Sequence, residues 1–274
     1  MSILSCAHTH TTFCDGKTPA ADMARRAFEL GFVSLGFSSH APQHFDPKYC
    51  VSPDGEEEYK SEIRALQREY EGRMPIYLGI ERDLYSCADP AGYDYFIAAV
   101  HYFEKPDGRH ATVDGYPESL KAYVDEFCGG DGLTMAKRYF ALLRDYVLSS
   151  RPAIIAHFDL VRKNNAVLRL YDEDSPAYRA LALDALRPLV DTGTLLEVNT
   201  GAMARGYLAT PYPAAFLLKE WKAWGGEVIV NSDCHDMKFL TCGFSEAEAL
   251  LLSLGYDHAV RLGRREMWER FRLG

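Results

Sequence analysis

The fold is decided by the way the chain begins, which is ILSCAHTH at residues 3–10. A short apolar run at 3–7 passes directly into His8-Thr-His10. Further apolar runs of similar length follow at 32–37, 76–80, 95–100, 153–156, 194–198 and 227–230. Each run is rich in Val, Ile, Leu or aromatic residues, which is typical of strands that are buried on both faces.

Longer amphipathic segments separate these runs. Apolar residues recur in them at a spacing near 3.6, which predicts helices at 20–30, 56–70, 133–149, 176–191, 213–224 and 245–254. Strands that alternate with helices indicate parallel βαβ units. Only residues 103–132 break this rhythm, and we expect a long loop or lid there with a short helix near 117–127. We therefore predict an α/β fold that forms a single domain over residues 1–274.

Side chains that can bind metal follow six of the seven predicted strands. In chain order they are His8 and His10, His40, Glu81, His101, His157 and Asp159, and Asp233 and His235. In a (β/α) barrel the carboxyl ends of the strands converge on one face, where active sites are built. Six of the nine histidines in the chain occupy such positions. This concentration indicates a shared site.

The spacing within the motifs supports a metal centre. His8/His10, His157/Asp159 and Asp233/His235 are separated by two positions, so on an extended strand both members of a pair point to the same side. Imidazole and carboxylate together are the ligand mixture of zinc, iron and manganese sites. An isolated histidine at a strand end is more often a hydrogen-bonded structural residue, so the joint pattern carries the prediction. Acidic residues gathered in one buried volume would also be costly without cations.

Bulk properties narrow the class of protein. The net charge of −9 argues against a broad nucleic-acid interface. The seven cysteines never form a C-x-x-C motif, which favours a reducing compartment over a disulfide framework. The start of the chain lacks the features of a signal peptide, and no apolar run reaches ~18 residues. We expect a cytoplasmic protein that has no membrane partner and is unlikely to bind nucleic acid.

The order of these motifs resembles that of the PHP (polymerase and histidinol phosphatase) family over nearly the whole chain. The matching residues are His8-Thr-His10 with Asp15-Gly16, then His40, Gly-Ile-Glu81, Val-His101, His157-Phe-Asp159 and Asp233-Cys-His235. The resemblance implies a distorted (β/α)7 TIM-like barrel. It also implies two or three divalent metal ions, which would be zinc, manganese or iron.

A ligand allocation follows from the same resemblance. One metal is expected on His8, His10, Glu81 and Asp233; a second on Glu81, His101 and His157; and a third on Asp15, His40 and His235. Many phosphatases of the family have a histidine where this chain has Gly16, so Asp15 is the expected substitute ligand. Glu81 and Asp233 are the expected catalytic residues. Asp159 is expected either to orient a ligand or to handle a proton.

Two further segments favour the phosphatase branch of the family. The segment His157-Phe-Asp-Leu-Val-Arg162-Lys163 resembles one in which a basic residue meets phosphate, and Arg205 resembles a second such residue. We predict that Arg162, Arg205 and, more weakly, Lys163 contact phosphate, because a guanidinium can bind phosphate oxygens in a bidentate way. The expected substrate is a small phosphorylated molecule, with L-histidinol phosphate as the best single choice. The expected step is attack of a metal-bridging hydroxide on phosphorus.

Three alternatives remain open at this point. Another phosphoesterase of the family would act on a nucleotide or on a nucleic-acid end and would need a basic groove. An amidohydrolase also begins with H-x-H but often uses a carbamylated lysine, where this chain has Glu81 and His101 at strand ends. A non-catalytic metal-binding module would lack some of the ligands. The sequence predicts neither the native metal nor the oligomeric state.

Overall fold

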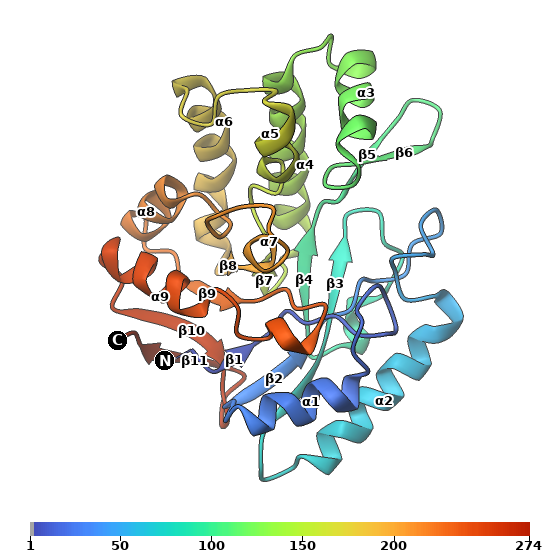
Figure 1. Ribbon diagram of the computed structural model, residues 1–274, viewed down its shortest axis with the longest axis vertical. Coiled ribbons are helices and arrows are strands. Elements are labelled where there is room, and N and C mark those ends of the chain that lie inside the picture. Colours follow the sequence, from blue (N-terminus) through green and yellow to red (C-terminus); the bar gives the residue numbers. More distant parts are fainter. Residues whose placement is uncertain (1–2) are drawn as a thin grey trace.

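A mostly parallel sheet forms the centre of the computed structural model, which describes residues 3–274 (Figure 1). Seven parallel strands confirm the seven predicted runs: β1 (Ser5–Cys6), β2 (Ser34–Phe37), β3 (Ile76–Asp83), β4 (Tyr95–Ala99), β7 (Ile154–Ile155), β8 (Leu195–Asn199) and β9 (Val228–Asn231). They are neighbours in this order. The α/β prediction is confirmed.

The sheet curls round so that its first strand meets its last parallel one. Just beyond β1 and β9, Thr9 and Cys234 form a parallel bridge, in which the His10 N–H donates to the Cys234 carbonyl at 2.9 Å. At the amino end, β10 (His258–Leu262) lies against β9, and its Leu262 carbonyl accepts from the hydroxyls of Ser5 and Ser34. The chain thus has the distorted seven-stranded barrel that was predicted. The hairpin of β10 with β11 (Trp268–Arg272) was not predicted.

The interior of the barrel is filled by one apolar cluster. Its members are Ala7, Tyr95, Ile97, Ala99, Ile154, Ala156, Leu195, Ile229, Val260 and Leu262. The Tyr95 ring fits only because glycine occupies positions 36 and 79, where a Cβ would lie 2.2 and 2.3 Å from Tyr95 atoms. Its hydroxyl donates to the Ala7 carbonyl at 2.5 Å. The amino-terminal part of the barrel is therefore packed, and the carboxyl end is left for the site.

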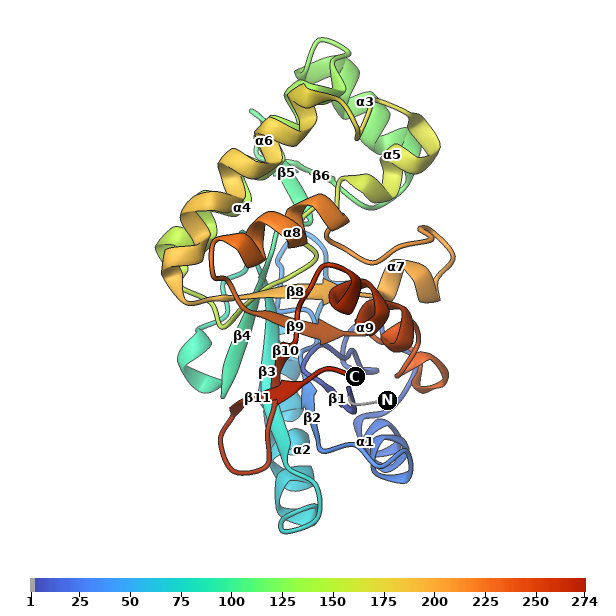
Figure 2. The ribbon, with the colours of Figure 1, turned by 90° about the vertical axis from the view of Figure 1, so that its left-hand side faces the viewer.

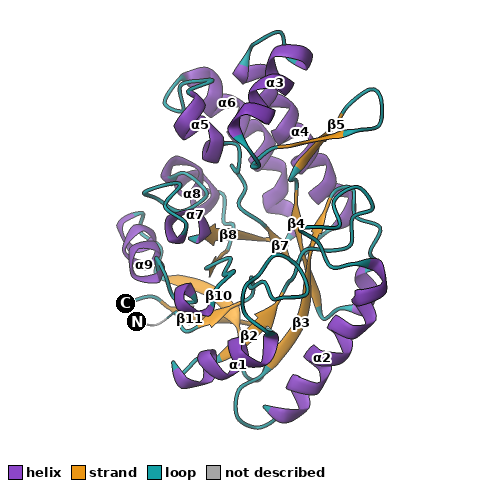
Figure 3. Cartoon of the chain, turned by 45° about the vertical axis from the view of Figure 1, so that its right-hand side comes forward, coloured by secondary structure: helices purple, strands orange, loops and turns teal. Residues whose placement is uncertain are grey.

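Helices cover the outside of the sheet (Figures 1 and 3). The six predicted helices are confirmed as α1 (Ala20–Glu29), α2 (Glu56–Glu69), α4 (Gly132–Ser150), α6 (Pro176–Leu186), α8 (Ala215–Ala223) and α9 (Phe244–Ser253). The helix predicted at 176–191 ends as α6 at Leu186 and continues as the 3-10 helix η3 (Arg187–Thr192), since Pro188 has no N–H to donate. The helix α8 begins at Ala215 rather than at Pro213. The preceding Ala214 N–H is bound by the Asp159 carboxylate.

Residues 103–132 are more ordered than predicted. They contain part of a small antiparallel hairpin, β5 (Tyr102–Glu104) with β6 (His110–Thr112), and the predicted short helix, α3 (Pro117–Phe127). The loop prediction was therefore wrong for the hairpin and confirmed for the helix. Figure 2 shows α3 beside α5 (Arg162–Leu168), which also was not predicted, in a layer next to α4 and α6. Within residues 3–274, the structure has no helix with the length and apolar character of a membrane span.

Candidate metal centre

The predicted ligands come together at the carboxyl ends of the strands around the carboxylate of Glu81. This residue lies near the end of β3 and is 1% exposed. Its Oε2 atom lies 2.8 Å from His40 Nδ1, 3.3 Å from His8 Nε2 and 3.5 Å from His10 Nε2. Its Oε1 atom lies 3.1 Å from His157 Nε2 and 3.5 Å from His101 Nε2. Five imidazoles from four different strand ends therefore meet one carboxylate.

Two further carboxylates extend the cluster. Asp233 Oδ1 lies 3.1 Å from His10 Nε2 and 3.5 Å from His235 Nδ1. Asp15 Oδ1 lies 3.3 Å from His235 Nε2 and 3.7 Å from His40 Nε2. Asp233 has a φ of 47°, a left-handed conformation that is uncommon for aspartate and is typical of functional sites.

The neighbouring Gly16 explains why this chain uses Asp15. A Cβ at position 16 would lie 2.6 Å from the backbone nitrogen of Thr11 and 2.7 Å from the carbonyl carbon of His10. No histidine fits there without moving the backbone of the His10–Thr11 segment. The aspartate one position earlier reaches the same histidines instead. The difference between this chain and many family phosphatases thus has a steric basis.

Nitrogen and oxygen atoms converge closely enough in three groups to hold cations. The groups are His8, His10 and Asp233; His40, Glu81 and His101; and His10, Asp15, His40 and His235. They overlap with the three expected centres but differ in detail. Glu81 belongs only to the group with His40 and His101, and His10 and His40 each belong to two groups. His157 belongs to none of the three and lies 3.1 Å from Glu81. The allocation of each ligand to one ion stays a prediction.

Buried polar atoms in the cluster test whether cations fit. The atoms His8 Nε2, His10 Nε2, Asp15 Oδ1 and Glu81 Oε2 are buried and have no hydrogen-bond partner within residues 3–274. Buried polar groups are nearly always satisfied, so atoms that converge without partners call for a ligand. Imidazole nitrogen and carboxylate oxygen suit zinc, manganese and iron. The residues therefore fit divalent metal ions.

The electrostatics of the cluster favour positive charge. Burial would lower the pKa of His8, but the carboxylates of Glu197, Glu81 and Asp233 raise it well above its usual value. Burial would likewise raise the pKa of Glu81, but the surrounding histidines hold it well below its usual range. His10 behaves differently, because burial and the neighbouring His235 and His40 lower its pKa to about 3. Its ring is neutral at physiological pH and can offer a lone pair to a cation.

A second layer of polar residues fixes the imidazoles, and the motif analysis missed its main member. Glu197 on β8 is fully buried, and its Oε1 lies 2.7 Å from His8 Nδ1, which directs His8 Nε2 toward the cluster. Its Oε2 accepts from the His157 N–H at 2.9 Å. Asp83 plays a similar part for His101, with Oδ2 at 3.4 Å from Nδ1. A carboxylate within an apolar buried strand, as in LLEVN at 195–199, was the available signal. Such partners set the tautomer and orientation of metal-binding histidines.

The basic residues that were predicted to contact phosphate have different surroundings in the structure. Arg205 borders the cluster: its guanidinium lies 3.0 Å from Asp233 Oδ2 and 3.0 Å from His235 Nδ1, and its side chain is 34% exposed. Lys163 donates to Asp114 and lies over the Tyr207 ring at 4.6 Å. Phosphate contact by Arg205 stays a prediction, and Lys163 is already bound by the Asp114 carboxylate.

Arg162 and Asp159 lie beside each other and bind the segment at residues 210–214. All three guanidinium nitrogens of Arg162 are bound by protein groups, with Nε 2.9 Å from Glu173 Oε2 and the others donating to Thr210 and Pro211. Asp159 lies 3.6 Å from Arg162 and accepts from the Ala214 N–H at 2.8 Å. The strand β7 ends at Ile155, so the i, i+2 argument does not extend to His157 and Asp159. Phosphate contact by Arg162 stays a prediction.

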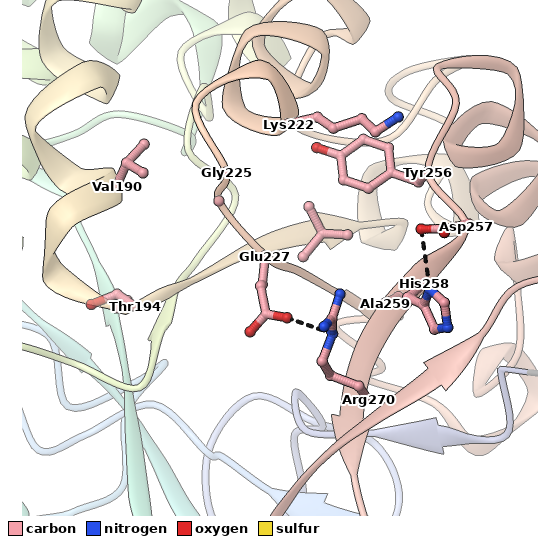
Figure 4. A pocket seen from close by; sticks show the side chains of 13 residues that line it. Val190, Thr194, Lys222, Gly225, Glu227, Tyr256, Asp257, His258, Ala259 and Arg270 are labelled. Carbon is pink, nitrogen blue, oxygen red and sulfur yellow. Dashed lines mark ion pairs between the residues drawn. The ribbon is translucent and has the colours of Figure 1, made fainter.

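A separate cavity lies at the amino ends of β8, β9 and β10 (Figure 4). It measures about 440 Å³, and Lys222, Glu227, His258 and Arg270 are among its lining residues. Four of its charged or titratable groups form pairs: Arg270 lies 2.8 Å from Glu227, and His258 lies 3.0 Å from Asp257. Lys222 donates to the Gly255 carbonyl. None of the three ligand groups in residues 3–274 includes a residue of this cavity. The three groups of candidate metal ligands lie at the opposite, carboxyl end of the barrel strands.

Comparisons with known proteins agree with this site. Residues 7–201 match the model of the PHP domain. A probable histidinol-phosphatase of Deinococcus radiodurans is 27% identical over 97% of this chain and 99% of its own length. The histidinol-phosphatase of Bacillus subtilis is 26% identical over 83% of this chain and 92% of its own.

A solved structure has the same fold. It is the histidinol phosphate phosphatase of Lactococcus lactis complexed with zinc, L-histidinol and phosphate, with a TM-score of 0.71, 20% identity and coverage of 97% of this chain and 98% of the other. The matched family model spans five of the seven barrel strands and seven of the nine predicted ligands. The chain belongs to the PHP domain family.

Proposed function

We propose that the protein is a metal-dependent phosphomonoesterase that hydrolyses L-histidinol phosphate to L-histidinol and inorganic phosphate. The observation that carries the phosphatase part is the convergence of five histidines on Glu81 with Arg205 at the edge of the same cluster. The choice of substrate rests on the relatives from Deinococcus radiodurans and Bacillus subtilis, which match over nearly their whole length. A cytoplasmic location and two or three zinc, manganese or iron ions are part of this proposal.

Three sets of residues would have distinct roles in such a reaction. The nine predicted ligands would hold the cations: His8, His10, Asp15, His40, Glu81, His101, His157, Asp233 and His235. When bound, divalent ions supply Lewis acidity to the phosphoryl oxygens and lower the pKa of a coordinated water. Glu197 and Asp83 keep the imidazoles oriented. Arg205 offers a guanidinium beside Asp233, where it would offset charge on a phosphoryl oxygen.

The substrate is tested by release of inorganic phosphate from a panel of phosphomonoesters. We expect L-histidinol phosphate to give the highest kcat/KM, above nucleoside monophosphates and sugar phosphates, in buffer that contains zinc or manganese. If a nucleotide were the best substrate, the assignment of histidinol phosphate would be wrong and the protein would act on another small phosphate ester. Release of phosphate from no member of the panel would contradict the phosphatase assignment.

The role of Arg205 is tested by inhibition with free phosphate. We expect Arg205→Ala to raise the phosphate inhibition constant roughly 10- to 150-fold, because a charge-assisted contact contributes ~1.5–3 kcal/mol. Lysine should restore only part of the loss, since a point charge cannot bind two oxygens at once. Arg25→Ala is the control, because Arg25 is an exposed arginine of α1 that is paired with Asp22. Inhibition that changes less than about twofold in Arg205→Ala would remove Arg205 from the phosphate site.

A further inference from the structure

Tyr212 carries a buried hydroxyl at the edge of the metal centre. The residue is 1% exposed, and its ring centroid lies 6.2 Å from that of His157. The hydroxyl finds no hydrogen-bond partner within residues 3–274. The charged side chains of Asp114, Asp159, Arg205 and Arg162 lie near enough to act electrostatically on this phenol. Buried hydroxyl groups in folded proteins almost always have a partner, which points to a ligand here.

We propose that the Tyr212 hydroxyl donates a hydrogen bond to a phosphoryl oxygen of the substrate, next to the guanidinium of Arg205. This inference rests on the proposed phosphatase function and adds a residue to its phosphate site. A tyrosine hydroxyl is protonated at physiological pH and therefore serves as a donor. A neutral donor suits an oxygen that already faces a cation and an arginine.

The backbone holds Tyr212 firmly toward the metal face. Its N–H donates to the Asn199 carbonyl at 2.9 Å, and its carbonyl accepts from the Asn199 N–H at 2.8 Å. Asn199 is the last residue of β8, and its side chain donates to Glu197 at 2.9 Å. The loop that carries Tyr212 is thus joined to the strand that carries the partner of His8.

Arg162 and Asp159 hold the same loop from the other side. Arg162 donates to Thr210 Oγ1 at 3.2 Å and to the Pro211 carbonyl at 3.3 Å, and Glu173 binds its Nε. Asp159 binds the Ala214 N–H. These contacts bracket Tyr212 in the sequence. We assign Arg162 and Asp159 as positioning residues that act through Tyr212.

Other tyrosines nearby serve as an internal comparison. Tyr171 and Tyr178 stack on each other with centroids 4.8 Å apart, and their hydroxyls also find no hydrogen-bond partner in the described chain. Neither ring contacts a predicted metal ligand among residues 3–274, whereas the Tyr212 ring faces His157. Tyr178→Phe is therefore a matched control: it removes the same atom from an equally buried residue behind the site.

Binding of inorganic phosphate to the metal-loaded protein provides the test. In isothermal titration calorimetry we expect Tyr212→Phe to weaken phosphate binding about 10- to 100-fold, with metal content unchanged, and Tyr178→Phe to stay within about twofold of wild type. Turnover of the best panel substrate should fall with Tyr212→Phe as well. If Tyr212→Phe bound phosphate as tightly as the wild type, this inference would be overturned and the proposed function would stand. A wild-type protein that binds no phosphate would count against the proposed function and this inference together.

The positioning role of Arg162 is tested by a double-mutant cycle on the same phosphate affinity. We expect Arg162→Ala to weaken binding in the wild-type background and to change it less than about twofold in the Tyr212→Phe background. A purely structural defect would lower the melting temperature and weaken binding in both backgrounds. Direct contact between Arg162 and phosphate would make the two losses multiply. Either of these last two results would contradict the positioning role.

Discussion

Replacement of Glu81 by glutamine is expected to lower kcat by at least ~10²-fold while the barrel stays folded. Five imidazoles from four strand ends meet the two oxygens of this one carboxylate. Glutamine has almost the same shape, but its neutral amide cannot bridge two cations and turns a donor toward them. The measurement is phosphate release at saturating substrate, with metal content determined on the same sample.

Glu58→Gln provides the control for this substitution. Glu58 is an exposed residue in the first turn of α2, so the same chemical change there should leave kcat within about twofold. A Glu81→Gln variant with near-wild-type turnover in metal-replete buffer would contradict the bridging role. Full loss of activity together with loss of the folded state, measured by circular dichroism, would assign Glu81 to stability instead.

Removal of the metal ions is expected to abolish activity and to destabilise the barrel. Three carboxylates, those of Asp15, Glu81 and Asp233, share a small and largely buried volume. Ions present at about 100 times their dissociation constant stabilise a folded protein by ~2.7 kcal/mol, and for a chain of this size 1 kcal/mol corresponds to about 2–4 °C. We therefore expect dialysis against a chelator to lower the melting temperature by roughly 5–10 °C.

Readdition of single metals completes this experiment. Zinc, manganese and iron are each expected to restore both the melting temperature and the activity, because the ligand set mixes imidazole and carboxylate. Magnesium should restore neither, since it binds imidazole poorly and prefers oxygen ligands. Chelated protein that keeps its wild-type turnover would show that the reaction needs no metal at this cluster.

The sequence predicted the parts of the structure that depend on local pattern. Seven apolar runs gave the seven barrel strands, and histidines or acidic residues just after them gave the cluster, because parallel strands all end on the same face. The hairpin β10–β11 was missed. Its strands carry Arg261, Glu269, Arg270 and Arg272, so they show little of the continuous apolar pattern of the barrel strands.

The surroundings of Arg162 could not be predicted from the local sequence pattern. Whether an arginine after a strand faces the substrate depends on its partners, and here Glu173, Thr210 and Pro211 are brought to Arg162 only by the folded chain. Glu197 was undervalued as a functional residue for the same reason, since its contact with His8 joins positions 189 residues apart. Tyr212 carries no motif of its own. It becomes notable only when the structure shows a buried hydroxyl without a partner beside His157.

The bridge between Thr9 and Cys234 also bears on how the protein is made. It brings His8 and His10 next to Asp233 and His235, so the binding site is assembled from the two extremes of the parallel barrel. A nascent chain on the ribosome cannot form this site until β9 has emerged from the exit tunnel. Cation binding by the group of His8, His10 and Asp233 therefore follows the closure of the barrel. An ion bound by both segments would link the start of the barrel to its last parallel strand. It would therefore slow the separation of these segments once the chain is complete.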